Sequence, residues 1–459
     1  MEAIRLQNFK GFQDSGWIAL KPITLLFGYN SSGKSSIMQA LLMMKQSLEN
    51  PASEVPFVFS SEKGVDLGTY EDIVYNHEIN PEKPVTFSLR VNIYKESYKK
   101  IYGSQEDFLR FSSLDTPKIE YSISVFYDQN KKTNEIKGIT IQDANGKNIL
   151  SISEKNFSSD YHSNVIQEAA LLKAIVTDEE ANAQSKSLLW DNFLPSVKGT
   201  IPVAYIIFLL SLLNRVIRSS FKSLLNIGPL RTAPKRFYIF TGENPATVGV
   251  YGENALPLLF LSKYSDDPDE LEAKVNDWLS AYNYQFEWKM LGSNLGQFIL
   301  KDIRTGLEVN LKDAGFGLSQ VLPVVIQAYA APKDSIVLIE QPEIHLHSRA
   351  QAELGDLFLK AVSHRPKRLI IETHSENLLL RIRRRMAENH LKKNPDPNIN
   401  PDNIAVYFIE NQNGQSLAHK IKLNDKGEFE NPPDGFRKFF TDDFEEVMKI
   451  NAAMAQMRN

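Results

Sequence analysis

The sequence predicts an α/β fold, built on a parallel-rich core sheet and interrupted by large insertions. From residue 313 to residue 380, helical patterns alternate with short, continuously apolar strands, which is typical of a parallel sheet covered on both faces. Near the start of the chain, the apolar run Ile23–Phe27 leads into a glycine-rich loop and then into a helical pattern. We therefore expect residues 1–83 and 312–410 to form one core.

The middle of the chain predicts two inserted lobes. Residues 84–160 contain runs that alternate apolar and polar side chains, and Asn145-Gly146 is typical of a tight turn between two strands. An antiparallel β lobe is expected there. Residues 161–311 have helical patterns followed by short strand patterns, which predicts a helical and mixed lobe. We expect residues 411–459 to form a C-terminal tail subdomain.

The composition is that of an ordinary globular protein. The chain has 459 residues, of which 42% are hydrophobic and 24% are charged, so it has ample apolar material for a core. It contains no cysteine, which excludes disulfides, thiolate metal sites and cysteine nucleophiles. The net charge of −4 gives no general attraction to nucleic acid, so such a contact would need a local basic patch.

Two features predict a cytoplasmic protein that does not cross a membrane. The first residues, MEAIRLQNFKGF, lack the apolar core of a signal peptide. The longest apolar stretch begins at Ile201 and is broken by Asn214 and Arg215, short of the ~18 apolar residues that a membrane span requires. We expect a buried helix in this stretch.

The segment GYNSSGKS, from Gly28 to Ser35, has the P-loop pattern G-x-x-x-x-G-K-S and lies between a strand pattern and a helix pattern. Its glycines allow backbone N–H groups to turn toward phosphate oxygens at the positive end of the helix. Lys34 would reach the β- and γ-phosphates, and the hydroxyl of Ser35 would bind magnesium. The sequence thus predicts a site for a nucleoside triphosphate.

Hydrolysis also requires an acid that holds the metal and a group that positions water. The apolar run Ser335–Ile339 ends in Glu340, and the carboxyl end of such a strand is where an α/β sheet presents its ligands. We assign Glu340 to the magnesium shell; the alternative is a solvated carboxylate at a strand end. His345 and His347 follow, and their spacing fits either a two-histidine metal site or a structural role.

Several segments resemble the ABC-type ATPases of the RecF, SMC and overcoming-lysogenization-defect group. In chain order they are LQNFKGF, NSSGKSS, the signature loop DAGFGLSQ (Asp313–Gln320), the Walker B segment LIEQPEIHLH and the His switch ETHSENLL (Glu372–Leu379). Two others, GPLRTAPKRFY and GEFENPPDGFRKFF, resemble a bacterial branch that often serves in antiphage defence. The resemblance implies an ABC-type ATPase head that carries an inserted antiparallel β lobe and a helical lobe.

The same resemblance implies ATP and Mg²⁺ as ligands and gives roles to residues of this chain. The triphosphate would be held by Gly28, Asn30, Ser31, Ser32, Gly33, Lys34, Ser35 and Ser36, and the metal by Ser35 and Glu340. His374 would sense the γ-phosphate, unless it only caps the next helix. In a homodimer or a larger homo-oligomer, the signature loop would close on the partner's ATP through Gly315, Gly317 or Ser319.

Gln341 departs from the family pattern, in which a glutamate follows the metal acid. Glutamine orients water through hydrogen bonds but does not accept its proton as a carboxylate does. Glu343 could replace that base if the turn at Pro342 brings it back to the site. Otherwise hydrolysis would be slow, and ATP would act partly as a clamp or a sensor.

The segment GPLRTAPKRFY combines prolines with basic residues, which predicts a loop that is held in a specific shape. Lys235 and Arg236 are its candidates for contact with nucleotide or with a carboxylate of a partner subunit. A second basic segment follows the His switch. It could contact a DNA backbone, form a solvated helix face or bind an acidic partner, and its arginines are Arg381, Arg383, Arg384 and Arg385.

Relatives that cut DNA carry an added Toprim domain, and the residues after His374 contain no matching Asp-x-Asp pattern. We therefore expect a separate effector, such as the HNH or Toprim nucleases that pair with ATPases of Septu or PARIS systems. The expected function is ATP-driven dimerisation that regulates this effector in prokaryotic antiviral defence. The alternatives are a RecF-like ATPase that acts directly on DNA in repair or chromosome maintenance, and a scaffold that binds ATP without turnover.

Overall fold

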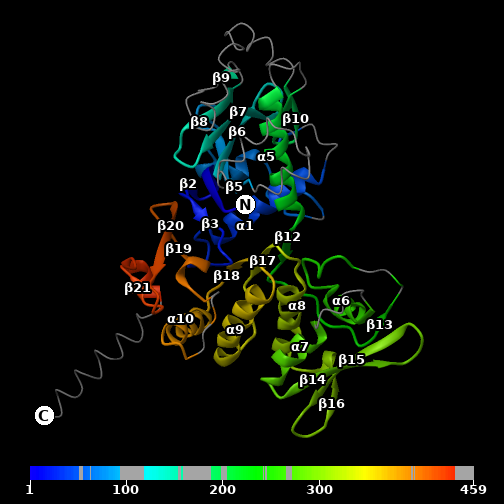
Figure 1. Ribbon diagram of the computed structural model, residues 1–459. Coiled ribbons are helices and arrows are strands. Elements are labelled where there is room, and N and C mark those ends of the chain that lie inside the picture. Colours follow the sequence, from blue (N-terminus) through cyan, green and yellow to red (C-terminus); the bar gives the residue numbers. More distant parts are fainter. Residues whose placement is uncertain are drawn as a thin grey trace, which may run out of the picture. The chain divides into compact units, whose positions relative to one another are not determined.

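The computed structural model describes residues 1–50, 55–62, 64–93, 118–153, 157–158, 188–197, 204–240, 242, 245–264, 271–393, 396 and 399–439. They belong to two compact units, and each unit is assembled from separate stretches of the chain (Figure 1). Unit 1 comprises Met1–Leu20, Ser31–Lys222 and Ile409–Ala418. Unit 2 comprises Lys21–Asn30, Ser223–Phe408 and His419–Asn459.

Unit 1 contains an antiparallel sheet in the order β2-β1-β5-β6-β7-β8-β9, with β3 paired to β1. Its strands are β1 (Ala3–Phe9), β2 (Phe12–Asp14), β3 (Ile18–Ala19), β5 (Val85–Asn92), β6 (Lys118–Asp128), β7 (Thr133–Asp143), β8 (Asn148–Ser153) and β9 (Phe157–Ser158). The predicted hairpin turn at Asn145-Gly146 is confirmed, because it joins β7 to β8 with Gly146 at a φ of 79°. Since β1 to β3 pair here, β4 is the strand of residues 1–83 that lies in the parallel sheet.

Helices and a hairpin complete the described part of unit 1. They are α1 (Lys34–Leu48), α2 (Tyr70–Ile73), η1 (Tyr75–His77), β10 (Leu188–Asp191), β11 (Leu194–Val197) and α5 (Ala204–Lys222). The buried helix expected after Ile201 is α5: Leu210, Leu213 and Ile217 are buried and the helix packs against α1. No helix in the described ranges is long and apolar enough to cross a membrane. The helical pattern predicted near residues 168–176 lies outside the described residues.

Unit 2 is built on a sheet in the order β12-β17-β18-β4-β19-β20-β21, although the segment Ile409–Ala418 of β19 and β20 belongs to unit 1. Its strands are β12 (Leu224–Ile227), β17 (Ile336–Glu340), β18 (Arg368–Glu372), β4 (Ile23–Gly28), β19 (Ile404–Gln412), β20 (Gln415–Leu423) and β21 (Phe429–Glu430). The first four strands run parallel, and β17, β18 and β4 are almost continuously buried, as is typical of parallel strands; β20 and β21 pair antiparallel. All six residues of β4 are buried. The α/β class with a parallel-rich core is therefore confirmed.

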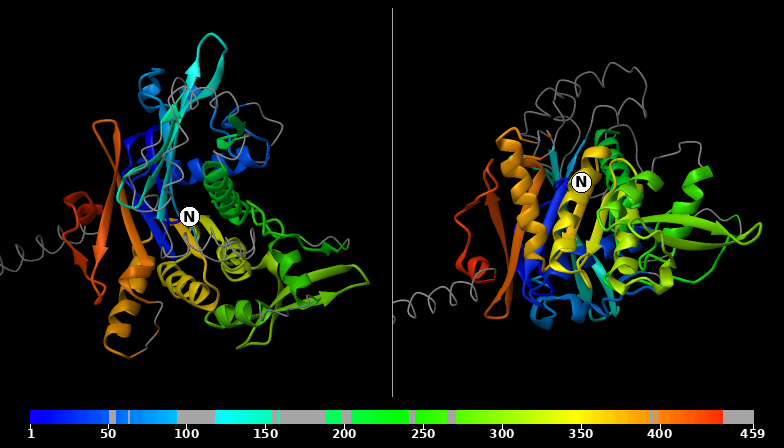
Figure 2. Two further views of the ribbon diagram at one scale, coloured as in Figure 1. Left: turned by 45° about the horizontal axis from the view of Figure 1, so that its top comes forward. Right: turned by 90° about the horizontal axis from the view of Figure 1, so that it is seen from below.

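The other elements of unit 2 surround this sheet. The helices are α6 (Ala255–Leu261), η7 (Ser262–Tyr264), α7 (Leu271–Ser280), η8 (Leu311–Asp313), α8 (Phe316–Ala330), α9 (Ser348–His364), α10 (Glu376–His390) and η9 (Pro401–Asn403). A small antiparallel sheet contains β13 (Tyr238–Ile239), β14 (Tyr284–Met290), β15 (Leu295–Asp302) and β16 (Glu308–Asn310). Helices α9 and α10, in yellow and orange, lie side by side (Figure 2).

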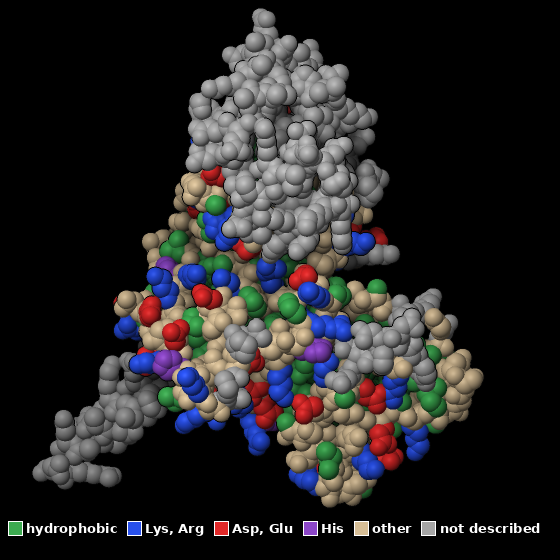
Figure 3. Space-filling model, viewed as in Figure 1, with side chains coloured by type: hydrophobic (Ala, Val, Ile, Leu, Met, Phe, Trp, Pro, Cys, Tyr) green, Lys and Arg blue, Asp and Glu red, His purple; other side chains and the backbone are tan. Residues whose placement is uncertain are grey.

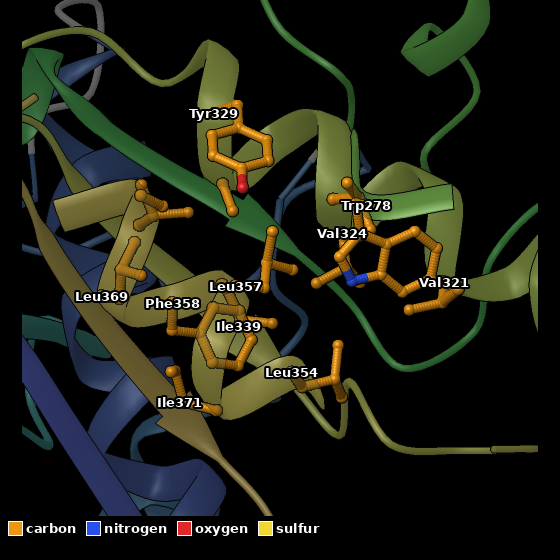
Figure 4. Close-up of a cluster of buried hydrophobic side chains, with 14 of the residues drawn as sticks. Trp278, Val321, Val324, Tyr329, Ile339, Leu354, Leu357, Phe358, Leu369 and Ile371 are labelled. Atoms are coloured by element: carbon orange, nitrogen blue, oxygen red, sulfur yellow. The ribbon is translucent and has the colours of Figure 1, made fainter. Parts of the chain in front are cut away.

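The core of unit 2 fills the space between the parallel strands and the helices α7, α8 and α9 (Figure 4). Strands contribute Ile339, Leu369 and Ile371, while α9 contributes Leu354, Leu357 and Phe358. Helix α8 is apolar on nearly all sides, because it packs on the sheet and on α6, α7 and α9. This packing fixes the ends of β17 and β18, where the candidate site residues lie.

Candidate functional site

The P-loop has the strand–loop–helix geometry that its sequence predicts. Strand β4 ends at Gly28, which has a φ of 149°, and α1 begins at Lys34. Between them the backbone takes left-handed values at Ser31 (φ 59°) and at Gly33 (φ 107°). A Cβ atom added to Gly33 would lie 2.7 Å from the hydroxyl oxygen of Ser416 in β20, so both the conformation and the space require glycine.

The first turn of α1 contains the predicted phosphate-binding residues. Gly33 occupies the N-cap position of this 15-residue helix. Because glycine has no side chain, it does not cap the first backbone N–H groups of the helix. Lys34, Ser32 and Ser36 are buried, while Asn30 and Ser31 are exposed. A helix N-terminus with this geometry favours an anionic ligand through its N–H groups and its dipole.

In unit 2, the carboxyl ends of neighbouring parallel strands bring acidic side chains together. Glu340 ends β17 and Glu372 ends β18, and the two residues are register partners. Leu26 of β4 pairs with Glu372, so β4 delivers the first residue of the P-loop, Gly28, to this same edge of the sheet. Burial, and then the nearby Glu372 carboxylate, raises the pKa of Glu340 from 4.5 to about 7. A cation bound here would favour the ionised form.

The turn after β17 holds Gln341 in a left-handed conformation with a φ of 43°. Its N–H donates to the carbonyl oxygen of Glu372 at 2.8 Å, and its own carbonyl oxygen accepts from Arg231 at 3.3 Å. Few residues other than glycine, asparagine and aspartate adopt this conformation, and such strain is typical of functional sites. Gln341 is thus fixed by its backbone next to Glu340.

Glu343 is buried and links the turn after β17 to the segment after β18. Its Oε1 accepts the backbone N–H of His374 at 2.7 Å. Burial raises the pKa of Glu343, and the hydrogen bond from His374 opposes that shift. The two predicted site residues are therefore in direct contact. Ser375, not His374, caps α10, since its hydroxyl accepts from the N–H of Leu378 at 3.2 Å.

The signature loop packs against the turn that follows β17, residues 341–346, which we call the Walker B turn. Gly315 is the N-cap of α8, and an added Cβ at Gly317 would collide with the carbonyl oxygen of His345. Ser319 is buried and lines a cavity of about 120 Å³ together with Lys235 and other residues of the proline-containing loop. Within one subunit, Gly317 is therefore explained by a close approach of two backbone segments.

Arg236, a sequence candidate for contact with a partner carboxylate, forms an ion pair within its own chain. Its two terminal nitrogens donate to the two carboxylate oxygens of Asp313 at 2.8 and 2.6 Å. The side chain of Asn310 also donates to the carbonyl oxygen of Arg236 at 3.1 Å. These contacts tie the proline-containing loop to the signature loop, which agrees with the prediction that this loop has a specific shape.

The two histidines of the Walker B segment have structural positions. His347 is the N-cap of α9, and its Nδ1 accepts the N–H of Ala350 at 3.3 Å. His345 lies in the turn before it with a φ of 65°. Among the described residues, no group of three or more histidine, aspartate and glutamate side chains could hold a metal ion. The capping role accounts for His347 without a metal.

Arg231 was missed by the sequence analysis, although its loop was singled out. It follows β12, the strand next to β17, and donates to the carbonyl oxygen of Glu340 at 2.7 Å. The side chain is buried, with 7% of its surface exposed. The sequence shows an arginine four residues after an apolar strand. Its role becomes clear only from the pairing of β12 with β17.

Residues 1–379 match a family model described as AAA ATPase domain. No protein of curated function matches the chain.

Among solved structures, an SMC head bound to the C-winged helix domain of ScpA aligns with 12% identity and a TM-score of 0.43, over 92% of this chain and 98% of that one. The SMC head domain from Thermotoga maritima aligns with 10% identity and a TM-score of 0.36, over 92% and 99%. An SMC head with an extended coiled coil, bound to the C-terminal domain of ScpA derived from Pyrococcus furiosus, aligns with 12% identity and a TM-score of 0.39. The alignment covers 100% of this chain and 99% of that one.

Proposed function

The chain belongs to the AAA ATPase domain family, and on this premise we propose that it binds ATP with Mg²⁺ and hydrolyses it slowly. One observation carries the proposal: the carboxyl edge of the parallel sheet collects Glu340, Gln341 and Glu372 at the edge from which the P-loop begins. Nucleotide sites of open α/β sheets lie at this edge. The phosphates would be bound by the P-loop residues from Gly28 to Ser36.

The residues present fit a magnesium ion that is bound mainly by the nucleotide. Mg²⁺ in such sites usually has one or two protein oxygen ligands, with phosphate oxygens and waters completing the shell. The hydroxyl of Ser35 and the carboxylate of Glu340 are ligands of this kind. When bound, the ion would neutralise charge on the phosphates during transfer. The raised pKa of Glu340 means that metal binding would compete with a proton near neutral pH.

We assign the positioning of water to Gln341 and the acceptance of its proton to Glu343. The amide of Gln341 donates and accepts hydrogen bonds, and its backbone is held on both sides. Glu343 is a carboxylate whose pKa is raised by burial, and a more basic carboxylate is a better proton acceptor. Because Glu343 is also tied to the N–H of His374, γ-phosphate sensing by His374 would be coupled to the base. A base that lies off the usual position favours slow turnover.

The proposal extends to dimerisation around ATP and to control of a separate effector, such as an HNH or Toprim nuclease, in antiviral defence. The signature loop would close on the partner's nucleotide through the N-terminus of α8, where Gly315 exposes backbone N–H groups. The sequence resemblance to antiphage ATPases supports the effector and the defence role.

The alternative that acts directly on DNA has less support from the basic segment in α10. Its arginines contact groups within the chain: Arg381 and Arg385 pair with Asp356, Arg384 pairs with Glu388, and Arg383 donates to the carbonyl oxygen of Gly427. On the visible face, positive and negative side chains are interspersed (Figure 3). Guanidinium groups that already have partners have fewer donors left for phosphates.

The test is ATP turnover and dimerisation measured together for the wild type and for Lys34→Ala, Gln341→Glu and Glu343→Gln. We expect slow wild-type turnover, below ~10 per second on the usual enzyme scale, and ATP-dependent assembly. Lys34→Ala should lose both, Gln341→Glu should be faster, and Glu343→Gln should be slower but still assemble. Fast wild-type turnover would contradict the slow clamp. Binding without any turnover in all four proteins would favour the scaffold.

A further inference from the structure

Arg231 is a buried cation at the carboxyl edge of the parallel sheet. One of its terminal nitrogens, Nη2, donates to the carbonyl oxygens of Glu340 at 2.7 Å and of Gln341 at 3.3 Å. The other two nitrogens, Nε and Nη1, have no acceptor among the described residues. The guanidinium therefore binds the backbone at the end of β17 and has unused donors in a buried place.

A buried guanidinium is expensive, and a protein keeps one where neighbouring groups compensate its charge. Burial lowers the pKa of Arg231 to about 10, while the Glu343 and Glu340 carboxylates oppose that shift. Arg231 therefore remains a cation at neutral pH. Leucine or methionine would fill the same volume without this cost, so packing alone does not explain arginine here.

The backbone that Arg231 contacts is the strained part of the turn. Gln341 has a φ of 43°, which costs roughly 1–3 kcal/mol for a residue of its type and persists only where neighbours enforce it. Three bonds enforce it: its N–H donates to the carbonyl oxygen of Glu372, and its carbonyl oxygen accepts from Arg231 at 3.3 Å and from the N–H of Ile344 at 3.4 Å. Without Arg231, the carbonyl oxygen of Gln341 would keep only the local bond from Ile344, and the end of β17 would lose its link to the loop after β12.

We propose that Arg231 is a positioning residue for hydrolysis. It sets the orientation of Gln341 and Glu343 by binding the backbone of the Walker B turn, and it does not touch the nucleotide. The inference rests on the proposed ATPase function and deepens it, because it assigns part of the hydrolysis rate to a residue outside the nucleotide-contacting set. Its direct consequence is that Arg231 controls the rate of the chemical step while the affinity for ATP depends on the P-loop.

Lys367 provides a matched control in the same unit. It is also a buried cation, and its Nζ donates to the carbonyl oxygens of Ala328, Tyr329 and Ala331 at 2.8, 3.3 and 2.9 Å. It precedes β18, so it lies at the amino end of that strand, whereas Arg231 lies at the carboxyl end of β17. Removal of Lys367 should destabilise the fold without moving the Walker B turn.

The experiment compares the wild type, Arg231→Met, Arg231→Lys and Lys367→Met by three measurements: ATPase kinetics, ATP affinity and hydrogen exchange of the nucleotide-free protein. Arg231→Met should lower kcat roughly tenfold to hundredfold while the Kd for ATP stays within about threefold. Exchange at residues 341–346 should be about tenfold faster. Arg231→Lys, which keeps a donor, should be intermediate. Lys367→Met should lower the melting temperature and leave kcat and exchange at 341–346 unchanged.

Three outcomes would overturn the assignment. They are a wild-type kcat in Arg231→Met, unchanged exchange at residues 341–346, and equal losses of kcat and ATP affinity, which would make Arg231 a binding residue. If Arg231→Met does not fold, the kcat and exchange of Arg231→Lys decide the same question. A wild type that neither binds nor hydrolyses ATP would instead refute the proposed function. In that case the exchange measurement still decides whether Arg231 holds the turn.

Discussion

The two ends of the parallel strands in unit 2 use similar chemistry for different results. At the amino end of β18, Lys367 binds three carbonyl oxygens at the end of α8, and at the carboxyl end of β17, Arg231 binds two. The carboxyl end also contains carboxylates with raised pKa values and a strained turn at Gln341. The amino end has a left-handed residue as well, Asp334, but aspartate tolerates that conformation. The amino end contains groups whose contacts stabilise the fold. The carboxyl end contains a strained turn and carboxylates with raised pKa values, which are features typical of catalytic sites.

The largest expected effect is a difference in ATP turnover between a variant at the carboxyl end of the strands and a variant at their amino end. Glu343→Gln should lower ATP turnover by about 10²- to 10⁴-fold, the usual contribution of a general base. The control is Ser335→Ala at the amino end, which removes a hydroxyl hydrogen bond to the carbonyl oxygen of Pro332 at 2.6 Å. That variant should lose roughly 1 kcal/mol of stability and keep wild-type turnover. Equal turnover losses in both variants would contradict the division.

The second prediction concerns stability and pH. The folded pKa of Glu340 is raised to about 7 from 4.5, so this group stabilises the fold below pH 4.5 and loses that contribution as pH rises through 7. Glu340→Gln should therefore stabilise the metal-free protein at pH 8 by roughly 3 kcal/mol, at about 1.36 kcal/mol per pKa unit. At pH 4 the two proteins should be alike. Denaturant unfolding at both pH values measures this, and a pH-independent difference would refute it.

The third prediction compares two glycines of the signature loop. Gly317→Ala places a Cβ against the carbonyl oxygen of His345 and should cost about 1–3 kcal/mol of folding free energy through forced backbone shifts. Gly315 has open space around an added Cβ and a φ of −53°, so Gly315→Ala should change stability much less. Thermal unfolding of the nucleotide-free proteins distinguishes them. Similar losses would mean that the signature loop does not pack on the Walker B turn as described.

The smallest effect is expected from relief of backbone strain. Gln341→Gly removes the left-handed penalty and should raise the free energy of unfolding by about 1 kcal/mol, while turnover falls because the amide is lost. Asp334→Gly should stabilise less, since aspartate already tolerates this conformation. Unfolding and ATPase assays on the two variants test the trade-off. A Gln341→Gly protein with normal turnover would remove Gln341 from the mechanism.

Local patterns were sufficient to predict the P-loop, the hairpin at Asn145-Gly146 and the buried parallel strands. Each of these depends on residues that are adjacent in sequence, such as the left-handed glycine Gly33 before α1. The pairing of β1 with β5 was not predicted, because an alternating strand of that length fits an antiparallel sheet as well as a core edge. The five-part domain division stays a prediction.

The contacts of the candidate site were less predictable because they are long-range. The bond from His374 to Glu343 spans 31 positions, and the bond from Arg231 to Glu340 spans 109. At α10, charge patterning left open whether Arg381 contacts a ligand or solvent, and it did not predict the ion pair with Asp356 of α9. Sequence placed Glu340 and Glu343 correctly near one strand end. It did not identify the buried cation that holds them, since an arginine in a loop is usually exposed.

The contact between Gly33 and Ser416 has a consequence for the order of events during synthesis. The hydroxyl of Ser416, which lies against Gly33 of the P-loop, is far from that glycine in the sequence and is translated later. The sheet neighbours of β4, β18 and β19, are also made late. During synthesis, the P-loop is therefore made well before these neighbours, and it gains them only after β18, β19 and Ser416 have been translated. A chain that stops before Ser416 would have a P-loop without this contact.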